Sequence, residues 1–268
     1  CYHRYPAKFI PQLVEKLFDE YLGEVTNAAV NDPFVGSGTT VVCAIARGYQ
    51  ASGTDINRIA ALITRVKATA IEPGYLARKV ADFERRIAFL APTARAFCLD
   101  AVGAEPMIPV RHAERIGYWF PTEQKRDLGY ILWAIHQEED PLVRDFLLVA
   151  FCHILKNCSI WLQTSTKPTR DFKKVPEKPY VAITRHLRKM QRGNKAFYDV
   201  VPERARNEVG SLLSVSAGDA RQQPVADGVV DLVVTSSPYV TSYEYADLHQ
   251  LSTIWLDLAD DLSDYKKQ

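Results

Sequence analysis

Long apolar runs are missing from the 268-residue sequence. No segment approaches the roughly 18 consecutive apolar residues that a membrane-spanning helix needs, and the start Cys1-Tyr2-His3-Arg4 lacks the charged-then-apolar plan of a signal peptide. The composition, 47% hydrophobic and 24% charged, instead fits a globular protein with a core of ordinary size. We therefore expect a cytoplasmic protein with no membrane partner. Because the first residue is not methionine, we expect the sequence to be a fragment or a processed product.

Cysteine pairs at metal-ligand spacing are also missing. The five cysteines are Cys1, Cys43, Cys98, Cys152 and Cys158. They form no C-x-x-C pair and have no nearby histidine at zinc-finger spacing. We therefore expect free thiols in a reducing compartment and no metal site.

Net charge is small, at a formal +1, but the charges are unevenly distributed. Residues 156–206 hold 13 Lys or Arg against 4 Asp or Glu, whereas the rest of the chain holds 20 against 28. Such a run is ordinarily a solvated face, although a segregated basic segment is also the footprint of phosphate binding.

Hydrophobic periodicity in the first 70 residues predicts a strand, a helix and a second strand after an opening amphipathic helix. The first strand ends at Asn31-Asp32-Pro33, a glycine turn follows, and Thr39 or Thr40 is placed to cap the next helix. The second strand ends at Asp55, and a further helix is expected over 57–70. Strand, helix and strand at this length form a βαβ unit, which requires a parallel sheet.

The alternation of strand and helix breaks after this unit and resumes near the end of the chain. The intervening segments are helical stretches at 75–90 and 122–162, a basic loop at 164–180 and a helix with a mainly basic surface at 181–201. Two more strands, within "LLSVSAGDAR" and "GVVDLVVTSSPY", and a final helix follow. We therefore predict an α/β fold with a parallel sheet flanked by helices. Residues 1–70 and 207–268 would form one domain, and 71–206 a helical insertion after the second strand.

The strand ends carry the residues most suited to binding a ligand, because ligands bind where the carboxyl ends of parallel strands meet. The four ends are the glycine turn 32–40, Asp55, residues 218–220 and the turn 236–239. Each also has a structural interpretation: helix–strand packing for the glycines, an N-cap for Asp55, a turn residue for Asp219 and a core aromatic for Tyr239. Their order and spacing together favour a ligand site. The glycine turn lacks a Gly-Lys-Ser/Thr ending, which excludes a P-loop.

These strand ends resemble four motifs of a known family. The stretches "DPFVGSGTT", "TDIN", "GDA" and "TSSPY" resemble motifs I to IV of the S-adenosylmethionine-dependent amino-methyltransferases, specifically the DNA methyltransferases that act on N4 of cytosine or N6 of adenine. The opening "HRYPAKFIP" resembles the segment that precedes motif I and closes over the cofactor. The resemblance covers roughly residues 1–70 and 212–258. It implies a Rossmann-like methyltransferase sheet and a catalytic domain that is incomplete at its C-terminus.

The resemblance implies S-adenosylmethionine as the cofactor. The backbone of the glycine turn would face its methionine part, Asp55 would bind its ribose, and Asp219 and Ala220 would lie by its adenine ring. The expected cofactor-binding residues are Phe9, Pro11, Asp32, Pro33, Phe34, Gly36, Gly38, Thr39, Thr40, Asp55, Ile56, Asn57, Asp219 and Ala220.

The resemblance also implies that Ser236, Ser237, Pro238 and Tyr239 form the catalytic turn. An exocyclic amine is a poor nucleophile because its lone pair is delocalised into the ring, so the site must accept its hydrogens to hold it near sp³ geometry. The Ser236 hydroxyl and the Ser237 carbonyl would accept them, while Tyr239 would stack on the base. Methyl transfer would be direct, aided by positioning and by stabilisation of the charge that forms on nitrogen. Serine at position 236 favours N4 of cytosine over N6 of adenine in this family.

The cysteines argue against methylation of cytosine C5. That reaction needs a thiolate, which its own family places behind a proline. The residues before the internal cysteines here are Val42, Phe97, Phe151 and Asn157. An amine acceptor therefore fits better than a carbon acceptor.

The implied partner is double-stranded DNA, with base flipping because the target must leave the helix. A cognate restriction endonuclease in a prokaryotic cytoplasm or nucleoid is a further partner that the resemblance allows. Beside such a site, the basic segment is most economically interpreted as binding phosphates. The expected DNA-contacting residues are Lys167, Arg170, Lys173, Lys174, Arg188, Lys189 and Arg192, with Tyr243 as a weaker candidate.

Two alternatives stay open. Some tRNA guanine-N2 methyltransferases share a similar glycine turn, but they resemble a pattern with Asp-Pro-Pro-Tyr in the fourth motif and carry an RNA-binding domain in front. The second alternative is a catalytically weak nucleic-acid-binding subunit. It is supported by Ser237, which stands where the family has proline and which leaves the turn less stiff.

Overall fold

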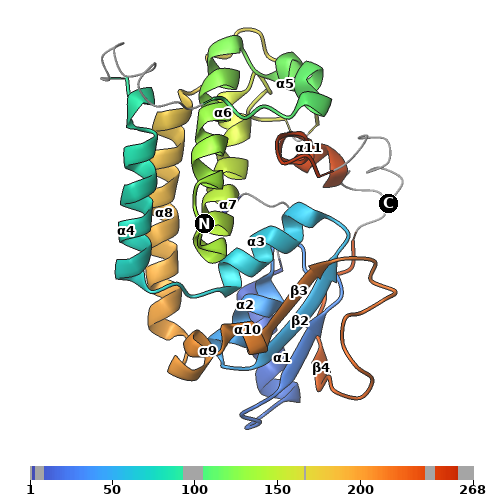
Figure 1. Cartoon of the computed structure of the whole chain (residues 1–268). Coiled ribbons are helices and arrows are strands. Elements are labelled where there is room, and N and C mark those ends of the chain that lie inside the picture. The colour runs from blue at the N-terminus through green and yellow to red at the C-terminus, as the bar shows by residue number, and fades with distance from the viewer. Residues whose placement is uncertain (1, 4–8, 93–104, 166, 239–244, 259–268) are drawn as a thin grey trace. The chain divides into compact units, whose positions relative to one another are not determined.

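The computed structural model of the chain divides into two compact units (Figure 1). The residues that the structure describes are 2–3, 9–92, 105–165, 167–238 and 245–258. The sheet unit consists of the described residues of Tyr2–Pro73 and Arg192–Tyr243. The helical unit consists of those of Gly74–Gln191 together with helix α11, Tyr245–Trp255. The last helix therefore groups with the helical unit, whereas the sequence analysis assigned 207–268 to the α/β domain.

A parallel sheet of four strands, in the order β3-β2-β1-β4, forms the centre of the sheet unit. The strands are β1 (Ala29–Asp32), β2 (Gln50–Asp55), β3 (Leu213–Ala217) and β4 (Leu232–Val233). Asp32 of β1 pairs with Gly53, and Asp55 of β2 pairs with Ala217, so the carboxyl ends meet at one edge. The predicted α/β fold with a parallel, Rossmann-like sheet is confirmed.

Strand β4 is shorter than the apolar run that predicted it. Only Leu232 and Val233 pair with β1, although the Val234 amide still donates to Asn31 O at 3.1 Å. The pairing stops here because β1 itself ends at Asp32.

The helices of the sheet unit pack on the sheet through one apolar cluster. They are α1 (Pro11–Tyr21), α2 (Thr39–Ala46), α3 (Arg58–Ala68), α9 (Glu203–Asn207) and α10 (Val209–Leu212). Phe18 of α1 and Ile45 of α2 are fully buried in this cluster together with Val30 of β1. Burial of each such side chain contributes about 1.5–3 kcal/mol, which holds α1 and α2 against the sheet.

The chain between β2 and β3 is largely helical, as the predicted insertion requires. Its elements, with the final helix, are α4 (Pro73–Arg86), η1 (Ala88–Leu90), η3 (Val110–His112), α5 (Ala113–Trp119), α6 (Thr122–His136), α7 (Pro141–Cys158), α8 (Pro179–Val200) and α11. Aromatic rings fill the helical unit: Trp119 stacks on Trp161 at 5.1 Å between ring centroids. The rings of Phe120 and Phe151 each meet Trp255 edge-on at 5.6 Å, which ties α11 to α5 and α7.

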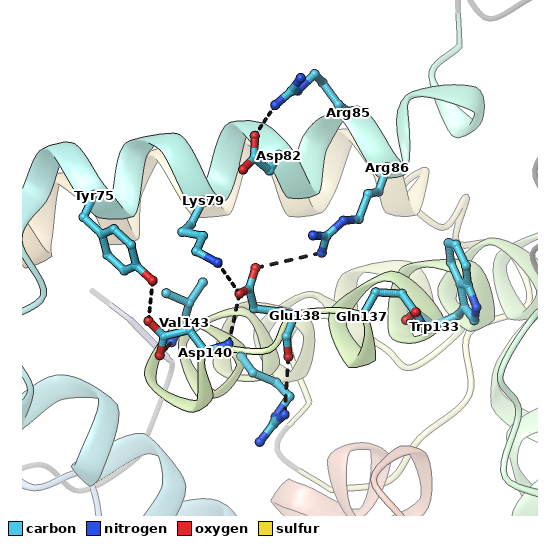
Figure 2. Close-up of polar contacts among 11 residues, drawn as sticks. Tyr75, Lys79, Asp82, Arg85, Arg86, Trp133, Gln137, Glu138, Asp140 and Val143 are labelled. Atoms are coloured by element: carbon cyan, nitrogen blue, oxygen red, sulfur yellow. Dashed lines mark hydrogen bonds and ion pairs between the residues drawn. The ribbon is translucent and has the colours of Figure 1, made fainter.

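Figure 2 shows how α4 is tied to the connection between α6 and α7. The Glu138 side chain, only 1% exposed, accepts a hydrogen bond from Lys79 Nζ at 2.7 Å and lies 3.9 Å from Arg86 Nη1. The same carboxylate accepts the Asp140 amide at 3.1 Å. Tyr75 donates its hydroxyl to Asp140 Oδ2 at 2.7 Å. A carboxylate this buried depends on its cationic partners, because an unpaired charge in the interior is strongly destabilising.

In the described part of the chain, no helix combines the length and the apolar character needed to span a membrane. The cysteines described there, Cys43, Cys152 and Cys158, are buried free thiols. Burial raises the pKa of all three, and that of Cys43 and Cys152 to about 12. None of these thiols is therefore activated as a nucleophile at neutral pH.

Candidate active site

The turn after β1 is built on two glycines in the left-handed region of backbone space. Gly36 has φ +49° and Gly38 has φ +77°, where side chains other than glycine are strained. A Cβ added to Gly38 would also lie 2.6 Å from Thr64 Cγ2. Gly38 is the N-cap of α2 and no side chain caps this helix, so the predicted cap by Thr39 or Thr40 is wrong. Glycine has no side chain with which to cap the helix, so the first N–H groups of α2 have no side-chain cap.

Asp55, at the end of β2, fixes this turn from the neighbouring strand. Its carboxylate accepts the amide of Gly36 at 2.9 Å through Oδ2 and the amide of Asn57 at 2.9 Å through Oδ1. Burial raises the pKa of Asp55; the two amide bonds oppose that rise, and nearby Asp32 adds to it. The N-cap of α3 is Asn57, whose Oδ1 accepts the Ile59 amide at 2.9 Å, and not Asp55. The capping interpretation of Asp55 is therefore wrong, and its carboxylate is directed to the glycine turn.

Asp32 joins the end of β1 to the end of β4. Its Oδ1 accepts the Thr235 hydroxyl at 2.7 Å and the Phe34 amide at 3.1 Å. Asp32 is 4% exposed, and burial raises its pKa although both hydrogen bonds lower it. Thr235 was not predicted as a site residue. The signal that could have found it is a hydroxyl directly before the Ser-Ser-Pro turn, at the end of a predicted strand.

Three further residues that sequence reasoning missed hold the loops at this edge. Thr64 of α3 donates its hydroxyl to Gly36 O at 3.2 Å, and Lys67 donates to Ser37 O. Gln223 donates through Nε2 to Thr54 Oγ1 at 2.9 Å, which links β2 to the loop after β3. These contacts span long stretches of sequence, and no local pattern marks them.

The end of β3 lies beside Asp55, because the Gly218 amide donates to Asp55 O at 3.0 Å. Asp219 forms an ion pair with Arg221, which lowers the pKa of Asp219 to about 2. Ala220 O accepts Gln223 Nε2 at 2.8 Å. The three strand ends of "DPFVGSGTT", "TDIN" and "GDA" are thus brought together at one edge.

The predicted catalytic turn follows β4 at the same edge. Ser236, Ser237 and Pro238 are exposed and come directly after Thr235, which is held by Asp32. Tyr239, predicted to stack on the base, and Tyr243, predicted to contact DNA, lie outside the described residues.

The remaining cofactor candidates surround the glycine turn. Thr39 donates its hydroxyl to Phe9 O at 3.4 Å, and Pro11 is exposed at the first position of α1. Ile56, next to Asp55, exposes 46% of its surface. Asn57 Nδ2 is buried and has no hydrogen-bond partner among the described residues. A bare backbone turn, an apolar side chain, a carboxylate and an unpartnered amide donor fit a ligand such as S-adenosylmethionine, which has anionic, sugar and ring parts.

The predicted DNA-contacting residues differ in how the structure uses them. Lys167, Lys173, Arg188, Lys189 and Arg192 are exposed, the last three on α8. The Arg170 guanidinium stacks between the rings of Tyr118 and Phe172.

Lys174 has an internal role. Its Nζ donates to the carbonyl oxygens of Lys156 and Trp161, both at 2.7 Å, and to Gln163 Oε1 at 3.3 Å. Burial lowers the pKa of Lys174 to about 8. This ammonium group is therefore engaged within the protein and is poorly placed for a phosphate.

Comparison with known proteins gives two relatives. The chain is 29% identical, over 97% of its length, to the Type II methyltransferase M.MvaI of Kocuria varians, of which it covers 58%. It is 42% identical over 67 residues to the Type II methyltransferase M.MjaII of Methanocaldococcus jannaschii, a match that covers 24% of this chain and 12% of that protein. The chain thus spans little more than half the length of the first relative. No family model and no solved structure matches.

Proposed function

We propose that the chain is an S-adenosylmethionine-dependent DNA methyltransferase that transfers a methyl group from S-adenosylmethionine to the exocyclic amine of a flipped base in double-stranded DNA. Its similarity to two Type II methyltransferases supports this proposal. We further propose N4 of cytosine as the acceptor in preference to N6 of adenine. One hydrogen bond, between Asp32 and Thr235, carries the proposal of methyl transfer. It ties the strand that leads into the glycine turn to the strand that leads into the Ser-Ser-Pro turn.

In this proposal the residues at the sheet edge hold the cofactor. Asp55 keeps acceptor capacity for the ribose hydroxyls, since each carboxylate oxygen accepts only one amide and carries a second lone pair. Asn57 Nδ2 and the exposed Ile56 offer a donor and an apolar surface beside it. Asp219 and Ala220 would lie by the adenine ring. Bound S-adenosylmethionine would supply the methyl group on its sulfonium.

The Ser-Ser-Pro turn would prepare the acceptor amine. The Ser236 hydroxyl and the Ser237 carbonyl would accept hydrogen bonds from its two N–H groups, which localises the nitrogen lone pair for attack. The proton that the methylated amine then loses would pass to solvent. Pro238 restricts the preceding residue to extended conformations, so it helps to fix the Ser237 carbonyl. The exposure of this turn leaves it open to a base that approaches from solvent.

In the same proposal, Lys167, Lys173, Arg188, Lys189 and Arg192 contact DNA phosphates, because they are exposed in the most basic segment of the chain. Lys174 is left out of this set because its ammonium group is held by carbonyl oxygens. A cognate endonuclease is a further proposed partner, and only the class of the two relatives supports it.

A second candidate, a nucleic-acid-binding subunit with weak catalysis, is favoured by one residue. Ser237 replaces a proline of the family pattern, and serine leaves both the backbone φ and the amide of this position free. The acceptor carbonyl remains, so the substitution weakens the geometry of the turn without removing a reacting group.

The decisive experiment combines a cofactor titration with a transfer assay. Calorimetry should show that the chain binds S-adenosylmethionine, and tritium should pass from labelled cofactor to unmethylated DNA and not to tRNA. Mass spectrometry of the product should identify N4-methylcytosine. Absence of cofactor binding would exclude the enzyme, whereas binding without transfer would favour the weak subunit, and labelled tRNA would favour the RNA alternative.

A further inference from the structure

Arginine and aromatic side chains form a stack in the helical unit. The Arg170 guanidinium lies 4.1 Å from the ring centroid of Tyr118 and 4.4 Å from that of Phe172. The guanidinium of Arg115 lies 5.1 Å from the Tyr118 ring. These four residues are called the arginine–aromatic stack. None of them belongs to the candidate active site.

The loop that carries Arg170 and Phe172 is held in a defined conformation. The Leu162 amide donates to Thr169 O at 2.8 Å. The Asp171 amide donates to Ile160 O at 2.7 Å. The Lys174 ammonium group closes the same loop on two backbone carbonyls. The stack is therefore presented on a preorganised loop, which lowers the entropy lost when a ligand binds.

Much of the stack faces solvent. Phe172 exposes 76% of its surface and Tyr118 exposes 42%. A single exposed aromatic residue is unremarkable in a protein surface. Here, however, the exposed ring is held against a cation, which fixes its orientation and leaves most of its surface available to a partner.

The surroundings of the ring favour nucleic acid over protein. Lys167 and Lys173 are exposed on the same loop. Arg170 Nε is buried and makes no hydrogen bond to any described residue, so stacking on the rings of Tyr118 and Phe172 orients this charge. Lysine is depleted at protein–protein interfaces, whereas cations interleaved with aromatic rings are typical of surfaces on which bases stack.

We propose that Phe172 is a base-stacking residue. It stacks on a base that has left its normal position in bound duplex DNA, while Lys167 and Lys173 contact the flanking phosphates. Such contacts compensate for the unstacking that base flipping requires. This inference rests on the proposed DNA substrate and adds a residue that reads a disturbed duplex outside the methyl-transfer site.

The test compares the affinity of the full chain for two duplexes of the same length, one fully paired and one with a single mismatch, by fluorescence anisotropy without cofactor. The chain should prefer the mismatched duplex. Phe172→Ala should weaken binding to that duplex by about 5- to 150-fold, which corresponds to the 1–3 kcal/mol of one stacked base. Phe172→Tyr should bind like the original chain. The fluorescence of a 2-aminopurine placed at the mismatch should rise when the original chain binds, because the base leaves its stack, and should rise less with Phe172→Ala.

The matched control is Val175→Ser, which removes an apolar side chain that is 89% exposed on the same loop but outside the stack. This variant should keep the preference for the mismatch. Because Phe172 is largely exposed, Phe172→Ala should melt at nearly the same temperature as the original chain. An unchanged affinity of Phe172→Ala for the mismatched duplex would overturn the proposal. So would an effect on self-association, by sedimentation, without an effect on DNA.

The same experiment separates this inference from the proposed function. If the chain binds no S-adenosylmethionine but still shows a Phe172-dependent preference for the mismatch, the stacking role stands and the methyl transfer fails. If the chain methylates DNA while Phe172→Ala binds both duplexes normally, the proposed function stands and the stacking role fails.

Discussion

At the scale of single residues, the ionisation of Asp55 should control cofactor affinity. Its carboxylate holds two backbone amides and is proposed to accept the ribose hydroxyls, so the ionised form is the binding form. Burial raises the pKa of this group above its ordinary value. The ionised fraction therefore begins to fall at a higher pH than for an exposed aspartate. We expect the affinity for S-adenosylmethionine to be highest at a pH well above this raised pKa and to be lost as the pH falls through it.

Isothermal titration with S-adenosylmethionine, at pH values above and below this pKa, measures the effect, and Asp55→Asn is the comparison. The amide variant accepts fewer hydrogen bonds and should bind the cofactor about 10- to 100-fold more weakly at neutral pH, as expected for loss of hydrogen bonds to a charged group. Its remaining affinity should vary little with pH. An equal pH dependence in both proteins would assign the titration to another group.

Ser237 offers a second test at this scale. Ser237→Pro restores the residue that the family pattern has at this position and fixes its φ, so the carbonyl that accepts the amine hydrogens should be held more firmly. We expect the rate of methyl transfer to rise by about 2- to 5-fold, with no change in cofactor affinity. Ser237→Ala, which leaves the backbone flexible, should react at the original rate. A slower Ser237→Pro enzyme would mean that the Ser237 amide or hydroxyl has a role of its own.

At the scale of elements, the buried ion pair of Figure 2 should stabilise the contact of α4 with the α6–α7 connection. Glu138→Gln keeps the shape of the side chain but removes the charge that faces Lys79 and Arg86. We expect the free energy of unfolding to fall by about 2 kcal/mol, below the range for a fully enclosed pair because both cations reach solvent. Urea denaturation followed by circular dichroism measures this loss.

Helix α4 also provides the control for that prediction. Asp82 and Arg85 form an exposed ion pair on the same helix, with 42% and 79% of their side chains exposed. Asp82→Asn should change the free energy of unfolding by less than about 0.5 kcal/mol, because exposed pairs are screened by solvent. An equal loss of unfolding free energy in the two variants would show that burial does not make the Glu138 ion pairs more stabilising than an exposed pair.

The elements also show which features a sequence can predict. The ends of β1 and β2 at Asp32 and Asp55 followed from local apolar runs and turn residues, and the structure has both. The length of β4 did not, because pairing depends on where its neighbour ends. The basic loop at 164–180 looked irregular because it has no periodicity, yet it is fixed by backbone bonds and by Lys174.

The candidate site shows the same division. The motifs placed the glycine turn and Asp55 at one edge from their positions after strands, since parallel strands end together. The sequence did not predict Thr235, Lys67 and Gln223 as site residues, because their hydrogen-bond partners are 203, 30 and 169 residues away. Nor did sequence spacing indicate that a Cβ on Gly53 would lie 2.3 Å from Asp32 O, which requires glycine where β2 passes the end of β1.

At the scale of the whole molecule, the segregation of charge should appear in the salt dependence of DNA binding. Residues 156–206 concentrate the basic charge, and α8 exposes Arg188, Lys189 and Arg192 within it. Each phosphate that such a residue neutralises contributes about 0.9 to the slope of log affinity against log salt. Replacing all three by alanine should therefore weaken binding to every duplex sequence and lower the steepness of that slope by about 2 to 3. Arg85→Ala removes an exposed arginine elsewhere in the helical unit and should leave the slope unchanged. Anisotropy titrations at about 50 to 300 mM salt, where counterion release dominates the salt dependence, measure the slope for each protein. If the triple variant kept the original slope, α8 would be a solvated face, and phosphate binding would have to lie on other basic residues of the chain.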